Sequence, residues 1–484
     1  MIRITWIAAI VCSFAWLIPL ATAADKPNIV LIFADDLGYG ELGCYGQEKI
    51  KTPELDKMAS QGIRFTHFYT GCPVCAPSRC VLMTGKHMGH SYIRDNRQVP
   101  VNGFQGQEPI PADTLTIAKL LQNNGYATAA FGKWGLGAPT STGDINKHGF
   151  DLFRGYHCQA HAHSHYPKFI FKNSEKEELA GNDGKQGTQH THEIFEQAAL
   201  EFIEANNTKP FFLYLPVTFT HVSLHVNEPD VAEYRGKLGD DPAYDGKQGY
   251  TPHPTPHAAY AAMVTRLDKT VGKLRQKLKE LNLDKNTLVI FTSDNGPTHG
   301  RVGGADSVYF NSTAGLRGLK GSVYEGGIRE PFVAAWPGKI PAGKVTDQPG
   351  IMYDLFPTFC DVASIKPPAG LDGSSLLPTL TGQGTQTQHP FLYWEFAGYG
   401  GQQAVQQGPW KAVRQKMQQG NKTTELYNLA NDPNEEKNVA ADNPQVVAQL
   451  EAVMVKEHTP SELFPIFALD GKKPSAGKAL PKQE

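Results

Sequence analysis

Pro27-Asn-Ile-Val-Leu-Ile-Phe-Ala34 is followed directly by Asp35-Asp36. A short apolar run of this kind, without alternating polar residues, is typical of a strand that is buried on both faces of a sheet. Similar runs occur at 211–216, 287–292 and 331–336, and segments with helical periodicity lie at 113–125, 193–205 and 256–281. Strands that alternate with helices in this way predict a layered α/β domain.

Polar residues stand just after three of these runs. Asp35 and Asp36 come after the first, His221 after the second, and Asp294 and Asn295 after the third. Because ligands of such sheets bind beyond the carboxyl ends of the strands, we expect these side chains to form one site. Adjacent carboxylates repel each other unless a cation or an arginine neutralises them. Oxygen ligands favour Ca²⁺ over zinc, with Mg²⁺ as the second choice, although an isolated Asp-Asn-Gly is also typical of a turn.

A cysteine-rich segment reads Cys72-Pro-Val-Cys75-Ala-Pro-Ser-Arg79-Cys-Val-Leu-Met-Thr84-Gly85. Its cysteine spacing also occurs in zinc sites and disulfides, but no second Cys or His pair follows at the usual distance. The sequence Cys-x-Pro-Ser-Arg followed by Thr-Gly resembles the signature of type I sulfatases. That resemblance implies that Cys75 is oxidised to Cα-formylglycine, whose hydrated aldehyde attacks a sulfate ester and then releases sulfate without attack by water.

The resemblance extends over most of the chain. Like these sulfatases, the chain has an Asp-Asp after its first strand, a Gly-Lys-Trp at 132–134, a histidine after a central strand, an Asp-Asn-Gly and a late lysine, in that order. It is similar to the group of arylsulfatase A and N-acetylgalactosamine-6-sulfatase. The resemblance implies an alkaline-phosphatase-like fold, in which helices sandwich a large mixed sheet and a smaller α+β subdomain lies at the C-terminus.

The same resemblance assigns roles to individual residues. The implied calcium ligands, together with the modified Cys75, are Asp35, Asp36, Asp294 and Asn295. Arg79 would steady the modified residue and balance the carboxylates, and Lys133 would bind the sulfate group. His221 would donate a proton to the leaving oxygen, with Lys320 beside the bridging oxygen. Lys133, His221 and Lys320 would thus contact the substrate, and each preorganised donor is worth about 3 to 4 kcal/mol in the transition state.

One position departs from the family pattern. Most relatives read Gly-Lys-Trp-His-Leu-Gly, and the histidine is the base that releases sulfate, but this chain has Gly135 in its place. Similar sulfatases without that histidine carry an Ala-His and a Tyr-Pro farther along, so we predict that His163 is the base, with His161 and His165 as substitutes. The alternative is that these three histidines lie on a solvated loop.

Composition limits the classes of partner. The formal net charge is −2 and the isoelectric point is near 6.8, which makes nucleic acid an unexpected partner. Clustered histidines favour a metal or anion site over a packed core. They occur at 157–165, 190–192, 221–225 and 253–257.

The N-terminus has the pattern of an export signal. One positive charge precedes an apolar run that ends in Ala21-Thr-Ala23, so residues 1–23 predict a signal peptide cleaved after Ala23. A membrane anchor is the weaker alternative, because Pro19 interrupts the run, and we expect no membrane span after cleavage. The mature protein would be periplasmic or secreted. Disulfides persist there, so a pair could form among Cys44, Cys72, Cys80, Cys158 and Cys360.

The chain is longer than the size at which a single hydrophobic core usually stops growing. We therefore expect a large domain and a second, smaller one. We place a catalytic domain at 24–385 and a C-terminal subdomain at 386–484, joined by a Gly- and Gln-rich linker at 381–388. The subdomain should contain a small antiparallel sheet and a helix that begins at Asn443-Pro444. Its strand-like pieces are at 390–396, 409–415 and 423–428.

The sequence therefore predicts an exported, calcium-dependent sulfuric ester hydrolase that is activated by a formylglycine-generating maturation enzyme. Its expected substrate is a sulfated carbohydrate, such as a sulfate of galactose or N-acetylgalactosamine. A phosphate or phosphonate ester hydrolase of the same superfamily is one alternative. A sulfated-glycan binding protein that has lost turnover is another, and Gly135 is the residue that favours it.

Overall fold

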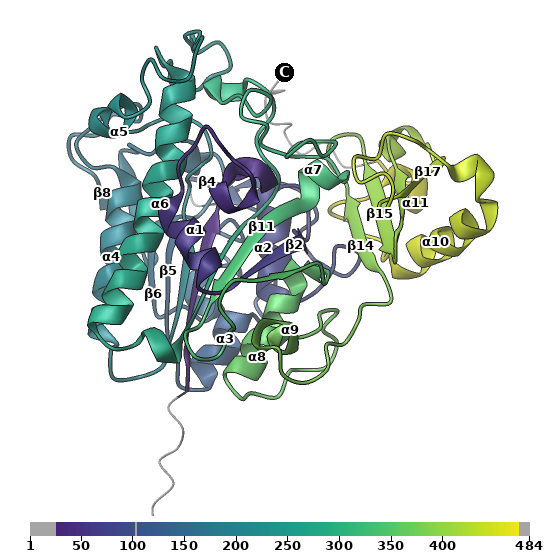
Figure 1. Cartoon of the computed structure of the whole chain (residues 1–484), viewed down its shortest axis with the longest axis horizontal. Coiled ribbons are helices and arrows are strands. Elements are labelled where there is room, and N and C mark those ends of the chain that lie inside the picture. Colours follow the sequence, from purple (N-terminus) through teal and green to yellow (C-terminus); the bar gives the residue numbers. More distant parts are fainter. Residues whose placement is uncertain (1–25, 102–103, 474–484) are drawn as a thin grey trace, which may run out of the picture.

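An eleven-stranded mixed sheet forms the centre of the protein in a computed structural model that describes residues 26–101 and 104–473 (Figure 1). β13 (Gly350–Ile351) pairs with β2 beside the main path. Across the sheet the order is β12 (Lys344–Thr346), β2 (Ile63–Tyr69), β11 (Arg329–Ala335), β10 (Thr287–Ser293), β1 (Asn28–Ala34), β9 (Phe211–Pro216), β5 (Ala127–Lys133), β6 (Leu152–Tyr156), β7 (Phe169–Lys172) and β8 (Glu175–Glu178).

The first apolar run of the sequence is the central strand of this sheet. β1 pairs in parallel with β9 and β10, and all seven of its residues are buried. β10 and β11 pair antiparallel, as do β11 and β2, so the sheet is mixed. The prediction of an α/β fold with a large mixed sheet is therefore confirmed.

Alternate residues of β1 enter two hydrophobic cores. Ile29, Leu31 and Phe33 belong to one apolar cluster, and Val30 and Ile32 belong to the other. The first core lies under α2 (Cys75–Thr84), α3 (Ile117–Asn123) and α8 (Leu355–Val362). The second lies under α1 (Pro53–Ser60), α4 (Thr191–Ala205) and α6 (Pro256–Glu280). Because helices cover both faces of the sheet, apolar and polar residues do not alternate along β1.

The C-terminal part is a separate antiparallel sheet at one side of the molecule (Figure 1). Its order is β14 (Leu392–Phe396), β15 (Gln402–Gln407), β16 (Trp410–Arg414) and β17 (Thr424–Asn428). α10 (Pro444–Glu457) packs on this sheet through a third apolar cluster. The proposed division between residues 385 and 386 lies in the irregular stretch between α9 (Leu377–Thr381) and β14. The remaining short elements are β3 (Gln98–Val101), β4 (Phe104–Gln107), α5 (Glu228–Ala232), α7 (Glu325–Ile328) and α11 (Phe467–Asp470).

A buried ion cluster ties the C-terminal sheet to the large domain. The Lys411 ammonium group on β16 lies 2.8 Å from a carboxylate oxygen of Glu325 in α7 and 2.9 Å from one of Glu435. Removing one partner of such a cluster costs about 3 to 5 kcal/mol, because a buried charge is left unpaired. This contact fixes the C-terminal sheet beside α7.

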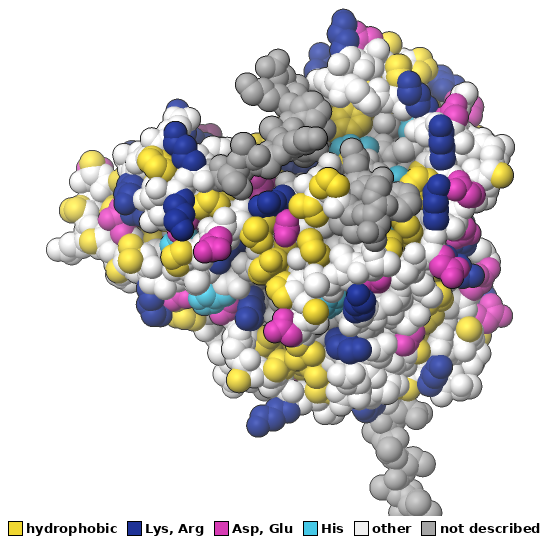
Figure 2. Space-filling view, turned by 180° about the vertical axis from the view of Figure 1, so that it is seen from behind, with side chains coloured by type: hydrophobic (Ala, Val, Ile, Leu, Met, Phe, Trp, Pro, Cys, Tyr) yellow, Lys and Arg dark blue, Asp and Glu magenta, His cyan; other side chains and the backbone are white. Residues whose placement is uncertain are grey.

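All six cysteines in the described ranges are free thiols, so none of the disulfide pairs considered for them is formed. Figure 2 shows one face of the molecule, on which basic and acidic side chains are interspersed.

Within the described ranges, no helix has both the length and the apolar character needed to cross a bilayer. The predicted signal peptide at 1–23 lies outside these ranges.

Candidate active site

The polar residues after β1 and β10 meet at the carboxyl ends of these paired strands. The Asp36 backbone N–H donates to Asp294 Oδ1 at 3.1 Å, and Asn295 Nδ2 donates to Asp36 Oδ1 at 2.8 Å. Asp36 has a φ of 62°, a left-handed conformation that turns the chain sharply after the strand. Asp35, Asp36, Asp294 and Asn295 are all fully buried.

Helix α2 brings the cysteine and the arginine of the signature to this cluster. Cys75 is the first residue of α2, and its Sγ lies 3.6 Å from Asp35 Oδ1. Arg79 lies one turn later on the same face of the helix. Its Nη2 is 2.7 Å from Asp294 Oδ2 and 3.7 Å from Asp35 Oδ2. The signature therefore packs directly against the strand-end carboxylates.

Two lysines complete the buried charges. Lys133, at the end of β5, forms an ion pair with Asp35, and its carbonyl oxygen accepts a hydrogen bond from Arg79 Nη1 at 2.5 Å. Lys320 Nζ lies 2.7 Å and 2.8 Å from the two carboxylate oxygens of Asp36 and 3.4 Å from Cys75 Sγ. Three carboxylates thus face three permanent cations around one thiol.

These charges alter the ionisation of the group. Burial opposes the ionisation of Asp35, but the charges of Lys133 and its neighbours hold the pKa of this carboxyl well below its usual range. Burial and the nearby charge of Asp35 raise the pKa of Asp294 to about 6. Burial raises the pKa of the Cys75 thiol to about 12, against the influence of the two lysines. The unmodified sulfur is therefore protonated at neutral pH, and a protonated thiol is a poor nucleophile.

His221 lies beside Asp36, and His163 lies against His221. His221 Nε2 is 3.6 Å from Asp36 Oδ2, and the His163 ring stacks on the His221 ring with centroids 4.8 Å apart and planes at 15°. Burial lowers the pKa of both imidazoles, so both are neutral at pH 7. His161 instead packs on Phe169, and the buried His165 bonds to Thr218 and to the carbonyl of His221. Of the three histidines considered as the base, His163 is the one whose ring stacks on the His221 ring.

Three other clustered histidines, His165, His190 and His192, form part of the packed core, so they do not act as the metal or anion ligands that clustering led us to expect. His165, His190 and His192 pack around Phe219, and burial lowers the pKa of each. Their hydrogen-bond partners are neutral carbonyl and hydroxyl groups, including the His225 carbonyl for His190. Neutral histidines with neutral partners pack like other polar core residues.

The strand-end oxygens fit a hard divalent cation. Asp35, Asp36 and His221 each place a ligand atom within 4.8 Å of the others, and so do Asp35, Cys75 and Asp294. Asn295 Oδ1 is buried and has no hydrogen-bond partner. An unpartnered buried carbonyl oxygen costs about 1 to 3 kcal/mol, and a cation would remove that cost. Carboxylate and amide oxygens are the ligands that Ca²⁺ and Mg²⁺ prefer.

A second group of potential metal ligands, His87, His90 and Glu457, is better explained by hydrogen bonds. His87 Nδ1 accepts a hydrogen bond from the Gly89 backbone N–H at 3.1 Å. The proton of the neutral ring therefore resides on Nε2, which donates to Glu457 at 3.2 Å. A protonated Nε2 has no lone pair for a metal.

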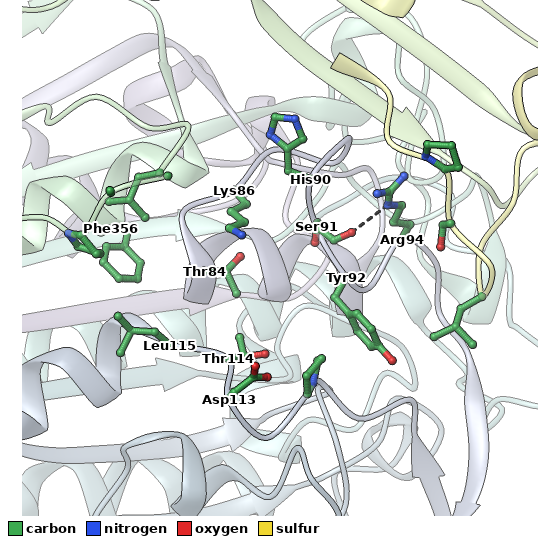
Figure 3. A pocket seen from close by; sticks show the side chains of 18 of the residues that line it. Thr84, Lys86, His90, Ser91, Tyr92, Arg94, Asp113, Thr114, Leu115 and Phe356 are labelled. Carbon is green, nitrogen blue, oxygen red and sulfur yellow. Dashed lines mark hydrogen bonds between the residues drawn. The ribbon is translucent and has the colours of Figure 1, made fainter. Parts of the chain in front are cut away.

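A cavity of about 810 Å³ lies at the other end of α2 and is lined by Thr84, Tyr92, Leu115 and Phe356, among others (Figure 3). Thr84 and Cys75 are the two ends of the helix, about 14 Å apart at the usual rise per residue. The cavity is therefore separate from the cysteine and the strand-end carboxylates.

The sequence did not indicate three residues of the site region, which are Gln159, Tyr399 and His299. Gly135 has a φ of 79°, and Gln159 lies against it. Tyr399, 58% exposed, packs over Gly321, the residue after Lys320, where a β-carbon would lie 2.9 Å from its ring. His299 stacks beside Tyr399, with ring centroids 5.7 Å apart. The sequence holds one feature that could have pointed to Tyr399, because this aromatic residue stands among glycines in Ala397-Gly-Tyr-Gly-Gly401.

Comparisons with known proteins agree with this geometry. The sulfatase family model matches residues 27–365, and the model of the C-terminal region of N-sulphoglucosamine sulphohydrolase matches residues 319–459. The N-acetylgalactosamine-6-sulfatase of Canis lupus familiaris is 33% identical over 394 residues, which cover 77% of this chain and 69% of that protein. The steryl-sulfatase of Mus musculus is 29% identical over 454 residues, covering 78% of this chain and 68% of that protein.

The solved structures give the same result. The crystal structure of Ps i-CgsB in complex with k-i-k-neocarrahexaose superimposes with a TM-score of 0.74 at 29% identity, and the match covers 93% of this chain and 94% of that one. A family model that covers most of the chain, relatives of this similarity and a shared fold lead to one assignment. The chain belongs to the sulfatase family and is a sulfuric ester hydrolase.

Proposed function

We propose that this sulfatase removes sulfate from a carbohydrate, with calcium held by the strand-end oxygens and formylglycine made from Cys75. The observation that carries the proposal is the position of Cys75 Sγ, 3.6 Å from Asp35 Oδ1 and 3.4 Å from Lys320 Nζ, in a buried cluster of opposite charges. A modified side chain at this point would face the oxygens of a bound sulfate group. The cluster also supplies the groups that such chemistry requires.

Formylglycine and calcium would each make a defined contribution. Formylglycine at position 75 would supply, in its hydrated form, one hydroxyl as the nucleophile and a second hydroxyl whose deprotonation allows sulfate to leave. Asp35, Asp36, Asp294 and Asn295 would hold calcium, which would supply positive charge to the site. The unpartnered Asn295 Oδ1 and the three carboxylates support this ligand set, with Mg²⁺ as the alternative ion.

The cationic side chains bind and orient the sulfate group. Lys133 and Lys320 are buried, so their charges are screened less than surface charges and act strongly on an anion. Arg79 is held by Asp294 and by the Lys133 carbonyl, so its guanidinium does not have to reorganise during the reaction. Preorganised charge of this kind stabilises a transition state in which negative charge develops on oxygen.

Two imidazoles handle the protons. The Nδ1–H of His221 donates to the Val222 carbonyl, so a second proton, taken up on Nε2 beside Asp36, is the one that the ring would deliver to the leaving oxygen of the substrate. His163 stacks on His221 and is half-buried, with a neutral ring at pH 7 that would accept the proton whose loss releases sulfate. The neighbouring pair thus divides the roles of acid and base.

The carbohydrate substrate is supported by the relatives and by one exposed aromatic residue. One relative is named as an N-acetylgalactosamine-6-sulfatase, and Ps i-CgsB was solved with a neocarrahexaose, so sulfates of galactose or N-acetylgalactosamine are the leading candidates. Tyr399 offers an exposed ring beside the Lys320 loop, where an apolar sugar face would pack. The aromatic ring lies in the loop between β14 and β15, so the C-terminal part would contribute to substrate choice.

Export and maturation complete the proposal. The signal pattern at 1–23 supports a periplasmic or secreted protein. The buried Cys75 would have to meet the formylglycine-generating enzyme before the chain folds, because its side chain is only 2% exposed in the folded protein.

The function is tested by co-expressing the chain with the maturation enzyme. We expect the Cys75 peptide to have the mass of formylglycine, and the protein to release sulfate from sulfated galactose or N-acetylgalactosamine. The Cys75→Ala variant should release none. Faster hydrolysis of nitrophenyl phosphate than of nitrophenyl sulfate would instead favour a phosphate or phosphonate ester hydrolase. Formylglycine with tight glycan binding and no sulfate release would favour a binding protein.

Calcium binding is tested by calorimetry and by thermal unfolding. We expect Ca²⁺ to raise the melting temperature, and chelation to abolish activity. The Asn295→Ala variant should weaken Ca²⁺ binding at least tenfold, because the unpartnered Oδ1 is lost. Asn206→Ala is the matched control. Asn206 is also a buried asparagine, but it lies in the segment before β9, at the end of the strands opposite to the site. Equal Ca²⁺ affinity in the Asn295 variant and the wild type would argue against this ligand set.

The role of His163 is tested by the stoichiometry of the first turnover. The His163→Ala variant should release about one equivalent of alcohol per enzyme and then stall without free sulfate. Its steady-state rate should fall about 10²- to 10⁴-fold, the usual contribution of a general base. His161→Ala is the control, because His161 packs on Phe169 instead. Steady turnover at the wild-type rate would exclude His163 as the base.

The role of Tyr399 is tested by separating KM from kcat. The Tyr399→Ala variant should raise KM for a sulfated oligosaccharide about three- to tenfold, with little change in kcat, because an aromatic contact is worth about 0.7 to 1.4 kcal/mol. Tyr399→Phe should retain the wild-type KM. Inhibition by inorganic sulfate should not change, since sulfate has no ring to pack. A KM equal to that of the wild type would remove Tyr399 from the substrate site.

A further inference from the structure

Gln159 fills the space that a side chain at position 135 would need. Gly135 has a φ of 79°, and a β-carbon built on it would lie 2.2 Å from Gln159 Nε2. The two segments run side by side, because the Trp134 N–H donates to the Tyr156 carbonyl and the Gly135 N–H donates to the His157 carbonyl. Gly135 therefore leaves room for an amide that arrives from the loop after β6.

The carboxamide of Gln159 is buried without a partner. Its side chain is 6% exposed, and neither Oε1 nor Nε2 makes a hydrogen bond. Each unsatisfied polar atom of this kind costs about 1 to 3 kcal/mol. The buried Gln403 shows the usual arrangement, since its Nε2 donates to Tyr393 Oη and to the Met454 carbonyl, and its Oε1 accepts from Arg414. Gln159 thus has a hydrogen-bond donor and an acceptor that no other group of the protein pairs with.

The amide lies next to the cationic wall of the site. The β-carbon position at Gly135 lies 2.2 Å from Gln159 Nε2 and 3.7 Å from Arg79 Cδ, so both side chains border the same small space. Gly135 is two residues after Lys133, whose ammonium group pairs with Asp35. A donor in this place lies beside the Arg79 side chain and near the end of β5, the strand that carries Lys133.

We propose that Gln159 is a sulfate-binding residue, whose Nε2 donates a hydrogen bond to an oxygen of the sulfate group. This inference rests on the proposed function, because it places the sulfate group among Arg79, Lys133 and Cys75. A neutral amide binds an anion without gaining or losing a proton, so it complements His163 and does not replace it as a base. The bound sulfate satisfies the amide that the folded protein leaves unpaired.

The decisive variant is Gln159→Met, which has a similar shape but no polar atoms. In the matured, calcium-loaded enzyme, we expect it to raise the Kd of inorganic sulfate, measured by calorimetry, at least tenfold. The melting temperature without sulfate should stay the same or rise, because an unsatisfied buried amide has been removed. Gln403→Met is the matched control and should do the reverse, lowering the melting temperature and leaving the Kd of sulfate unchanged.

A double-mutant cycle tests whether Gly135 and Gln159 act together. In Gly135→Ala the new β-carbon overlaps the end of the flexible Gln159 side chain and makes an ordinary contact with Arg79 Cδ at 3.7 Å, so the amide should be displaced. The φ of 79° strains the backbone of this variant, so its melting temperature should also fall. Both single variants should then lose similar sulfate affinity, and the double variant should lose little more than either one. In Gln159→Met the alcohol and sulfate should be released in equal amounts, unlike in His163→Ala.

Two outcomes would overturn the inference. A Kd of sulfate within twofold of the wild type in Gln159→Met would show that the amide does not bind the anion. A lower melting temperature in that variant, with no loss of sulfate affinity, would show that Gln159 supports the fold. If the wild-type enzyme itself does not bind sulfate, the proposed function fails together with this inference. A wild-type enzyme that binds sulfate and an unaffected variant would refute the inference alone.

Discussion

Buried charge pairing at the carboxyl ends of the strands is the constraint on which the site depends. The pairs are Asp35 with Lys133, Asp36 with Lys320, and Asp294 with Arg79. Each partner of a pair comes from a different segment of the chain, and every one of these side chains is at least nine-tenths buried. Because an unpaired buried charge costs several kcal/mol, the segments can pack only in an arrangement that keeps all three pairs together.

This balance also has a consequence for ligands. Three carboxylates and three cations make the described side chains nearly neutral as a group, so an anion alone or a divalent cation alone would leave excess buried charge. A sulfate ester and a divalent cation that bind in the same cluster offset part of each other's charge. The unpartnered oxygen of Asn295 and the unpartnered amide of Gln159 lie in this cluster and beside it, one suited to a cation and the other to an anion.

The sequence predicted those strands and site residues that follow from the pattern of apolar and polar residues along a short segment. β1 and β10 could be predicted because strands buried on both faces are continuously apolar, and the acidic pairs stand where such strands end. β15 could not, because its sequence Gln-Gln-Ala-Val-Gln-Gln is polar and its buried glutamines find partners far along the chain, such as the Gly321 carbonyl for Gln402 and the Met454 carbonyl for Gln403. The choice of His163 over His161 depends on which ring reaches His221, and spacing along a loop does not contain that information.

Gln159 shows a further limit of sequence reasoning, because its position matters only through contact with Gly135, 24 residues earlier. The structure also shows why its unpaired amide differs from other unpaired polar groups. Glu330 on β11 is fully buried with both oxygens unpartnered, and burial raises its pKa well above the usual range, so it can hold a proton and become neutral. An amide is already neutral and cannot reduce its cost in this way. Gln159 therefore stays unsatisfied until a ligand arrives, and a protein retains such a cost where function requires it.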